Sequence, residues 1–200
     1  TVTLTVSATS IAENAGSSLT LTATLSGAVD ETVTVGIDTG GTSTEGTDYT
    51  DGSGNVDDIT ISAGSTTGTV NFTPTDDSVY EGNETATIAI SSVTGEASES
   101  GTQAVTITIT DNESAPTVTL TTSATSIAEN AGSSLTLTAT LSGTTDATIT
   151  VALDTSGTAT EGTDYTDGSG NIDDITISAL GTTGTVTFNP TTDTTCEINN

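Results

Sequence analysis

The sequence predicts an all-β protein made of two tandem antiparallel β-sandwiches of immunoglobulin-like architecture, the second of them incomplete. Three observations lead to this fold class. Val, Ile, Leu and Thr alternate in many short runs, which is the pattern of strands that are buried on one face. Clusters of Gly, Asp, Asn and Ser separate these runs, and no segment has the 3.6-residue apolar period of a helix. The chain also repeats itself at a spacing of 116 positions.

The repeat sets the expected domain boundaries. Residues 2–25 match residues 118–141 with one change, Val6 to Thr122, and residues 44–55 match residues 160–171 without any. We therefore expect a first sandwich over residues 1–113, a short linker over residues 114–116 and a second repeat over residues 117–200.

Seven runs of the first repeat predict strands. In each run, apolar residues alternate with Thr or other polar residues, so one face is apolar and the other is rich in Thr. Strands of this kind, separated by turns over about 115 residues, predict two antiparallel sheets packed face to face. The runs cover residues 2–6, 18–26, 32–38, 58–62, 69–73, 85–91 and 104–110.

The second repeat ends early. Asn200 corresponds to Glu84, so the runs at residues 85–91 and 104–110 have no counterparts in this sequence. A sandwich without two strands exposes apolar side chains and unpaired backbone groups. Two interpretations remain open: the sequence is a segment of a longer array of repeats, or neighbouring molecules donate strands and build a filament. Donation of a single strand would not close a gap of two.

The charge composition excludes several classes of function. The chain has 27 Asp and Glu and no Lys, Arg or His, which gives a formal net charge of −27. Such a polyanion repels nucleic acid and anionic membrane surfaces, and no apolar stretch is long enough for membrane insertion. Without a His base, a Lys amine or an Arg clamp, we expect that the protein is not an enzyme.

The same composition indicates a metal. Carboxylates that a fold brings together repel one another unless a cation lies between them, and Ca²⁺ is the hard cation that takes oxygen ligands. The single cysteine, Cys196, offers no internal disulfide to stabilise the fold instead. Cys196 aligns with Tyr80, so it either fills an apolar slot or forms an intermolecular disulfide.

Four acidic motifs occur in a defined order. IAENAG lies at residues 11–16, GTSTEGTDY at residues 41–49, DDSVYEGNE at residues 76–84 and DNE at residues 111–113. Together they resemble the Calx-beta family of calcium-binding sandwiches, found in exchanger regulatory domains, integrin tails and arrays of bacterial surface proteins. The resemblance covers the first repeat and the first 84 residues of the second.

The resemblance implies that calcium ions cluster at one end of the sandwich. Ser78 stands where a third consecutive Asp is expected, and Asn112 interrupts the closing acidic run, which implies fewer ions or weaker binding. The ligands that the resemblance implies are the side chains of Glu13, Asp48, Asp76, Asp77, Glu81, Glu84, Asp111 and Glu113, and the backbone carbonyl of Val79.

The second repeat keeps only part of this set. Thr192 replaces Asp76, Asn200 stands in place of Glu84, and the closing tripeptide has no counterpart, so we expect weak calcium binding there or none. The ligands implied for this repeat are Glu129, Asp164, Asp193 and Glu197.

These observations predict a calcium-binding structural repeat of an extracellular adhesin or surface fibre. Residues 111–113 continue into the linker and Pro116, so an ion there would stiffen both the sandwich and its junction. The expected partners are calcium ions and neighbouring repeats or copies of the same protein, at the cell surface where external calcium is abundant. Two alternatives stay open: a filament subunit that uses strand exchange, and a calcium-sensing regulatory domain.

Overall fold

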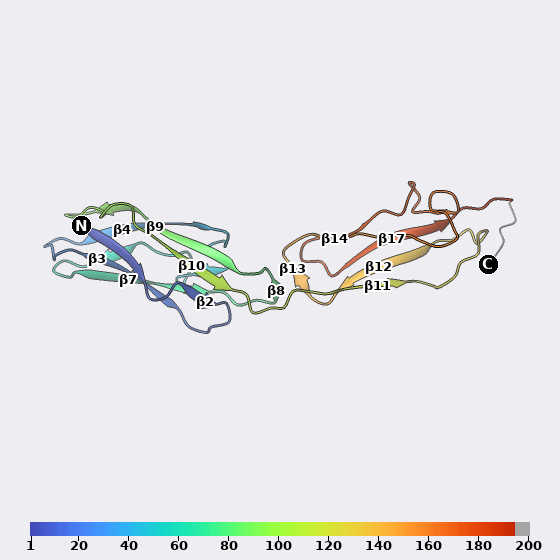
Figure 1. Cartoon of the computed structure of the whole chain (residues 1–200). Coiled ribbons are helices and arrows are strands. Elements are labelled where there is room, and N and C mark those ends of the chain that lie inside the picture. Colours follow the sequence, from blue (N-terminus) through green and yellow to red (C-terminus); the bar gives the residue numbers. More distant parts are fainter. Residues whose placement is uncertain (195–200) are drawn as a thin grey trace. The chain divides into compact units, whose positions relative to one another are not determined.

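The computed structural model describes residues 1–194 and divides the chain into two compact units, Thr1–Glu113 and Ser114–Asn200 (Figure 1). All regular structure in residues 1–194 is β-strand. Within the same residues, no helix is long and apolar enough to cross a membrane. The predicted class, tandem antiparallel β-sandwiches, is confirmed.

The first sheet of unit 1 has four antiparallel strands. Its order is β1 (Val2–Val6), β3 (Leu19–Leu25), β7 (Thr67–Pro74) and β5 (Tyr49–Thr50). Along β3, every Leu and the Ala is buried while each Thr between them is only half-buried, as the alternation of side chains across a strand requires. This alternation turns the apolar face of the sheet toward the core.

The second sheet has five strands and packs against the first. Its order is β2 (Ser10–Ala12), β10 (Ala104–Thr110), β9 (Glu84–Thr94), β4 (Val33–Gly41) and β6 (Ile59–Ile61), with β8 (Val79–Tyr80) preceding β9. Only β2 and β10 pair in parallel. Figure 1 shows β9 and β10 side by side in this sheet.

A continuous core lies between the two sheets of unit 1. Leu21 and Phe72 of the first sheet and Ile88 and Ile107 of the second are 0% exposed and belong to one cluster. The ring of Tyr49 stacks on Phe72 with centroids 4.6 Å apart. Burial of apolar surface on both sheets is the main term that holds the sandwich together.

Gly41 brings the end of β4 close to the start of β9. Its φ is 114°, and a Cβ at this position would lie 2.0 Å from the Thr85 carbonyl oxygen. The N–H groups of Thr42 and Ser43 donate to that same oxygen at 2.8 and 3.1 Å. The glycine therefore fixes the loop after β4 against β9, and this loop carries Asp48.

Unit 2 repeats the first sheet of unit 1. The sheet contains β11 (Val118–Thr122), β12 (Leu135–Leu141), β17 (Thr183–Pro190) and β15 (Tyr165–Thr166). The pairing of Val118 with Leu141 reproduces the pairing of Val2 with Leu25.

The rest of unit 2 is smaller than its counterpart. Within residues 114–194, the second layer consists of β14 (Ile149–Val151) paired with β16 (Ile175–Ile177), and β13 (Thr144–Thr145) is a further short strand. The cluster of buried apolar residues between these layers is correspondingly small and contains Ala139, Leu141, Ile175 and Ile177.

Each of the seven predicted runs overlaps a strand of unit 1, although β4, β7 and β9 extend beyond the predicted bounds, and β2, β5 and β8 were not predicted. These strands have two or three residues, too few to show an alternation. β2 and β5 form because β10 and β7 offer free edges beside them.

One turn of unit 2 carries backbone strain that can be removed. Leu180 has a φ of 61°, whereas the same turn in unit 1 has Gly64 at 78°. The two turns are otherwise alike, since the Leu180 N–H donates to the Thr145 carbonyl and the Gly64 N–H to the Val29 carbonyl, both at 2.7 Å. The Leu180 side chain is 62% exposed, so its removal costs little packing.

We expect Leu180→Gly to raise the free energy of unfolding of unit 2 by about 1 kcal/mol, because a left-handed conformation is costly for leucine. A urea titration followed through the amide NMR signals of β17 measures it. The matched variant Gly64→Leu should lower the stability of unit 1. An unchanged or lower stability of Leu180→Gly would show that this turn is not strained.

Candidate metal centre

One end of unit 1 collects the acidic motifs because several strands begin or end there. β4 ends at Gly41 and β10 at Thr110, while β9, antiparallel to both, begins at Glu84. β2 is parallel to β10 and ends beside it at Ala12. The loops at this end therefore carry all four acidic motifs, although they are far apart in the sequence.

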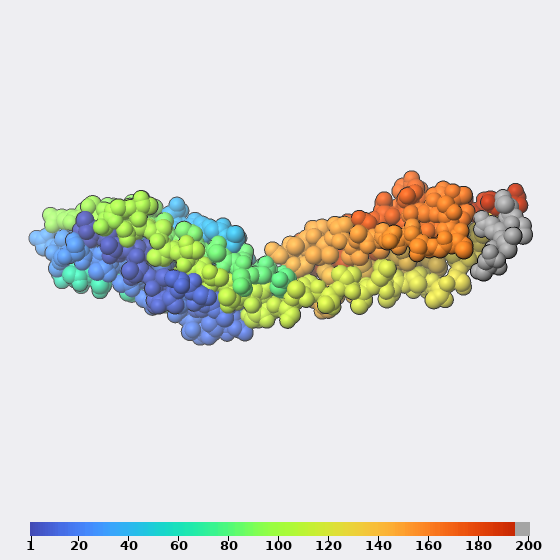
Figure 2. All heavy atoms as spheres, viewed as in Figure 1, coloured from blue at the N-terminus to red at the C-terminus, as the bar shows by residue number. Residues whose placement is uncertain are grey.

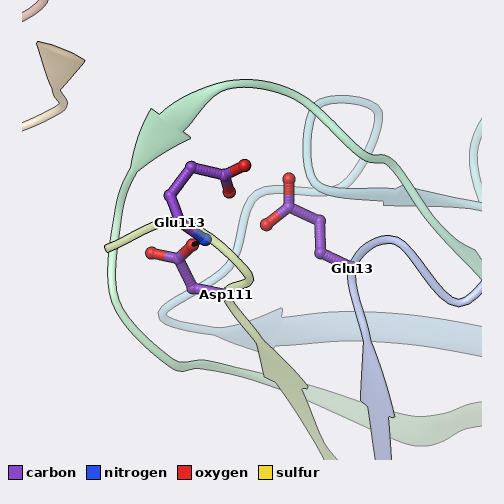
Figure 3. A group of neighbouring side chains, drawn as sticks. All are labelled: Glu13, Asp111 and Glu113. Atoms are coloured by element: carbon purple, nitrogen blue, oxygen red, sulfur yellow. Dashed lines mark hydrogen bonds between the residues drawn. The ribbon is translucent and has the colours of Figure 1, made fainter. Parts of the chain in front are cut away.

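Three carboxylates form the first group, which we name the Glu13 cluster: Glu13, Asp111 and Glu113. Each offers an oxygen that lies within 4.8 Å of the others. Glu13 follows β2, and Asp111 and Glu113 follow β10; Figure 3 shows the carboxylates of Glu13 and Glu113 facing each other, with Asp111 beside them. The Glu13 N–H donates to the Thr110 carbonyl at 3.0 Å, which holds the two segments together.

A second group, the Asp48 cluster, consists of Asp48, Glu81 and Glu84, with oxygens again within 4.8 Å of one another. Asp48 is oriented by its own loop, because its Oδ2 accepts from the Thr44 N–H at 2.5 Å. Glu84 is the first residue of β9, opposite Ile109 of β10. The cluster thus joins the loop after β4 to the segment that leads into β9.

Asp111 links the two clusters. Its Oδ2 accepts from the N–H groups of Glu81 at 2.8 Å and Gly82 at 2.6 Å, and its Oδ1 accepts from the Glu113 N–H at 2.7 Å. Glu81 belongs to the Asp48 cluster and Glu113 to the Glu13 cluster. The Asp111 carboxylate therefore holds a backbone segment of each cluster in place.

The pKa values of the three carboxylates in the Glu13 cluster are shifted in different directions. Burial raises the pKa of Glu13, and the charges of Asp77, Asp111 and Asp76 raise it further. Desolvation and a hydrogen bond with Asp111 raise the pKa of Glu113. Burial also raises the pKa of Asp111, but three backbone N–H donors outweigh it and hold that pKa below its ordinary value. The cluster therefore contains a fixed anion beside two acids that resist ionisation.

This donor set fits a hard cation. The Oε2 of Glu113 is buried and, within the described part of the chain, has no hydrogen-bond partner. The sequence has no Lys, Arg or His to neutralise it. Six carboxylates and no nitrogen or sulfur donor suit Ca²⁺ rather than a transition metal. The residues that would hold such ions are those of the Glu13 and Asp48 clusters.

The structure thus brings six of the eight predicted side chains of unit 1 into the two clusters. The other two, Asp76 and Asp77, are exposed beside them. The Asp77 N–H donates to Glu13 Oε1 at 2.7 Å, while its Oδ1 accepts from the Val79 N–H at 2.7 Å. The role of the Val79 carbonyl as a ligand stays a prediction.

Among the described residues of unit 2, the predicted ligands do not form such a group. Glu129, whose counterpart Glu13 is 6% exposed, is itself exposed, and its Oε1 accepts from the Asp193 N–H at 2.5 Å. Asp164 accepts from the Thr160 N–H at 2.5 Å, as Asp48 does from Thr44. No group of three carboxylates forms within residues 114–194. Glu197 and Cys196 lie outside the described residues.

Glu45 has a role that sequence reasoning missed. Its Oε1 accepts from the Val56 N–H at 2.7 Å and its Oε2 from the Thr39 hydroxyl at 3.1 Å, so it braces the loop that carries Asp48. Glu161 makes the same pair of contacts in unit 2. No sequence signal separates this structural acid from Asp48, three residues later in the same motif.

The pKa of Glu13 predicts how the metal-free protein responds to pH. Because that pKa is raised, the folded state binds more protons than the unfolded state above the ordinary pKa of Glu, and stability falls as the pH rises through the folded pKa. With EDTA and high salt, we expect Glu13→Gln to equal the wild type at about pH 4 and to exceed it at about pH 7.

Urea unfolding of unit 1 across this range measures the difference between the two proteins. Glu31→Gln, at an exposed acid before the start of β4 and outside both clusters, is the matched control. Parallel curves for Glu13→Gln and wild type would contradict the predicted effect.

Comparisons with known proteins agree with the acidic motifs. The model of the Calx-beta domain family matches residues 1–113 and 111–174. Similar solved structures include an apo-form Calx CBD1 domain, with 18% identity, a TM-score of 0.45 and coverage of 56% of this chain and 97% of that one.

Two further structures contain CBD12. The one from CALX1.2 has 18% identity and a TM-score of 0.47, and covers 94% of this chain and 74% of that one. The one titled calcium binding domain CBD12 of CALX1.1 has 20% identity and a TM-score of 0.45, and covers 89% and 70%. Curated protein sequences gave no match. Because the family model matches residues 1–113 and 111–174, which is more than half of the chain, the chain belongs to the Calx-beta family.

Proposed function

We propose that this protein is a calcium-binding structural module of an extracellular adhesin or surface fibre. The observation that carries the proposal is the pair of carboxylate clusters at one end of unit 1, in a chain without a single basic side chain. Ca²⁺ between these carboxylates replaces repulsion with attraction and ties four loops to one another. The role is structural, and it requires no catalytic group.

The position of Asp111 and Glu113 supports a stiffening role. Both follow β10 directly and lead into residues 114–116, so an ion held by them restricts the chain just before the linker. Pro116 restricts the same segment further. A module that repeats almost unchanged is suited to spacing, because spacing requires repetition whereas sensing requires sites of different affinity.

The affinity expected of this site supports an extracellular location. The closing run has one Asp, one Asn and one Glu, so fewer anionic ligands are available than in an all-Asp run. Sites of modest affinity are saturated at millimolar calcium, the range of extracellular modules. Binding only to the folded state then stabilises the module by mass action.

Calcium should raise the melting temperature of unit 1. At a concentration about 100 times the dissociation constant, one ion contributes about 2.7 kcal/mol, or a shift of about 10 °C. We expect Glu13→Gln and Glu84→Gln to lose most of this shift, because each removes an anionic ligand from one cluster. Differential scanning calorimetry with EDTA and with calcium measures it.

Glu31→Gln is again the control and should keep the full shift. Equal melting temperatures with EDTA and calcium in the wild type would refute the proposal. A micromolar dissociation constant together with a large change in hydrodynamic radius would favour a calcium sensor over a structural module.

The ions should bind in unit 1 alone. We expect Glu129→Gln to leave the stoichiometry of calcium binding unchanged, because Glu129 is exposed and belongs to no group of three carboxylates within residues 1–194. Glu13→Gln should lower the stoichiometry or the affinity. Isothermal titration calorimetry of both variants tests this, and a loss of bound calcium in Glu129→Gln would assign a site to unit 2.

A further inference from the structure

We propose that Glu45 is a positioning residue for calcium: it fixes the loop that carries Asp48 in the conformation that the Asp48 cluster requires, and it does not bind the ion. This role rests on the proposed function, because it assumes that the Asp48 cluster binds calcium. Within residues 1–194, Glu45 belongs to neither group of three carboxylates, and both of its oxygens already accept hydrogen bonds from the protein.

The segment that carries Asp48 needs a tether to hold one conformation. Residues 42–58 connect β4 to β6, and their only strand is the two-residue β5. The segment contains three glycines, and most of its residues are exposed. Its light blue atoms lie at the surface of unit 1 in Figure 2. Ordering such a segment costs conformational entropy, which contacts with the rest of the sandwich must offset.

Glu45 ties this segment to the sandwich at two points. Its Oε1 accepts from the N–H of Val56, which is 8% exposed and belongs to the core cluster. Its Oε2 accepts from the hydroxyl of Thr39, which lies in β4 opposite Ile88 of β9. Hydrogen bonds to an ionised acceptor are stronger than neutral ones. The carboxylate therefore joins the loop both to the core and to the sheet in which β9 begins with Glu84.

Asp48 lies in the turn that surrounds Glu45. The Asp48 N–H donates to the Thr44 carbonyl at 2.9 Å, and the Thr44 N–H donates back to Asp48 Oδ2 at 2.5 Å. The Gly46 N–H donates to the Tyr49 carbonyl at 2.8 Å. Glu45 stands between Thr44 and Gly46, so a displacement of Glu45 shifts the Asp48 carboxylate relative to the other two members of its cluster.

Unit 2 shows that the brace forms without a cluster beside it. Glu161 Oε1 accepts from the Ile172 N–H at 2.5 Å and Oε2 from the Thr155 hydroxyl at 2.8 Å, while the Thr160 N–H again donates to Asp164. No group of three carboxylates includes Asp164 within the described part of unit 2. The brace is therefore set by the sequence of the loop itself. A loop ordered in advance lowers the entropic cost of binding an ion.

Two variants of Glu45 separate its hydrogen bonds from its charge. Glu45→Ala removes both bonds and should weaken calcium binding by the Asp48 cluster about tenfold, the size of effect that partners of metal ligands have. Glu45→Gln should keep most of the affinity, because its amide oxygen can accept from the Val56 N–H while its NH₂ donates to the Thr39 hydroxyl. The number of bound ions should be unchanged in both variants.

Calcium titrations of the full 200-residue chain, followed through the amide NMR signals of Glu81 and Glu84, measure these affinities. Thr39→Val is a milder variant, which keeps the charge of Glu45 and removes one donor, and it should weaken binding about threefold. Glu161→Ala is the matched control. It removes the same brace from unit 2 and should leave the calcium affinity of unit 1 unchanged.

Hydrogen exchange in EDTA tests the brace without any ion. We expect the Asp48 and Gly46 amides, which donate within the turn, to exchange faster in Glu45→Ala than in the wild type. Amides of β3 should exchange at the same rate in both proteins, because that strand lies in the first sheet and has no contact with the brace. This pattern separates local loosening of the loop from a general loss of stability.

Equal calcium affinity for Glu45→Ala and wild type, or equal exchange of the Asp48 amide, would overturn the positioning role. An equal loss of affinity in Glu45→Gln and Glu45→Ala would also overturn it, because the charge of Glu45 would then matter rather than its hydrogen bonds. A loss of affinity in Glu161→Ala would show an unspecific effect. A wild-type chain that binds no calcium would instead refute the proposed function, so the two failures are distinguishable.

Discussion

The pairing of β9 and β10 with the rest of the second sheet is the interaction on which unit 1 depends. These strands close the core over Leu21 and Phe72, and they supply the edges on which β2 and β4 are ordered. They also carry Glu84 at the start of β9 and Asp111 just after β10. The same two strands therefore close the core and position carboxylates of both clusters.

Repulsion among the carboxylates of the Glu13 and Asp48 clusters destabilises the fold that brings them together. Antiparallel pairing brings the ends of β4 and β10 beside the start of β9, and in each of the two clusters the carboxylates offer oxygens within 4.8 Å of one another. Backbone N–H groups of Glu81, Gly82 and Glu113 stabilise one of these anions, Asp111. The buried Glu113 Oε2 has no such donor in residues 1–194, and Glu13 is held in a buried position among acids. A divalent cation bound between these carboxylates would offset this repulsion.

The two repeats act as an internal comparison. Their sequences are identical over residues 44–55 and 160–171, and the braces made by Glu45 and Glu161 are the same. The stacked pair Tyr49 and Phe72 also recurs, as Tyr165 and Phe188 with ring centroids 4.5 Å apart. Local structure is therefore a property of the local sequence. Strand formation at residues 152–157, burial of Leu120 and clustering around Glu129 all differ, and each of these depends on contacts with β9 and β10.

The sequence by itself determined the fold class, the repeat and most strands, because alternation of Val, Ile and Leu with Thr encodes which face of a strand is buried. The order of the acidic motifs also predicted Glu13, Asp48, Glu81, Glu84, Asp111 and Glu113 as ligands, and the structure places these six carboxylates in two clusters. Only the tertiary structure decided that these six separate into two clusters, that Asp76 and Asp77 lie outside them, and that Glu45 braces a loop. The reason is that the sequence shows which residues are acidic but not which residues lie next to them in the folded protein. Those neighbours come from strand pairings between segments that are far apart in the sequence, such as Thr110 of β10 with Ala12 of β2.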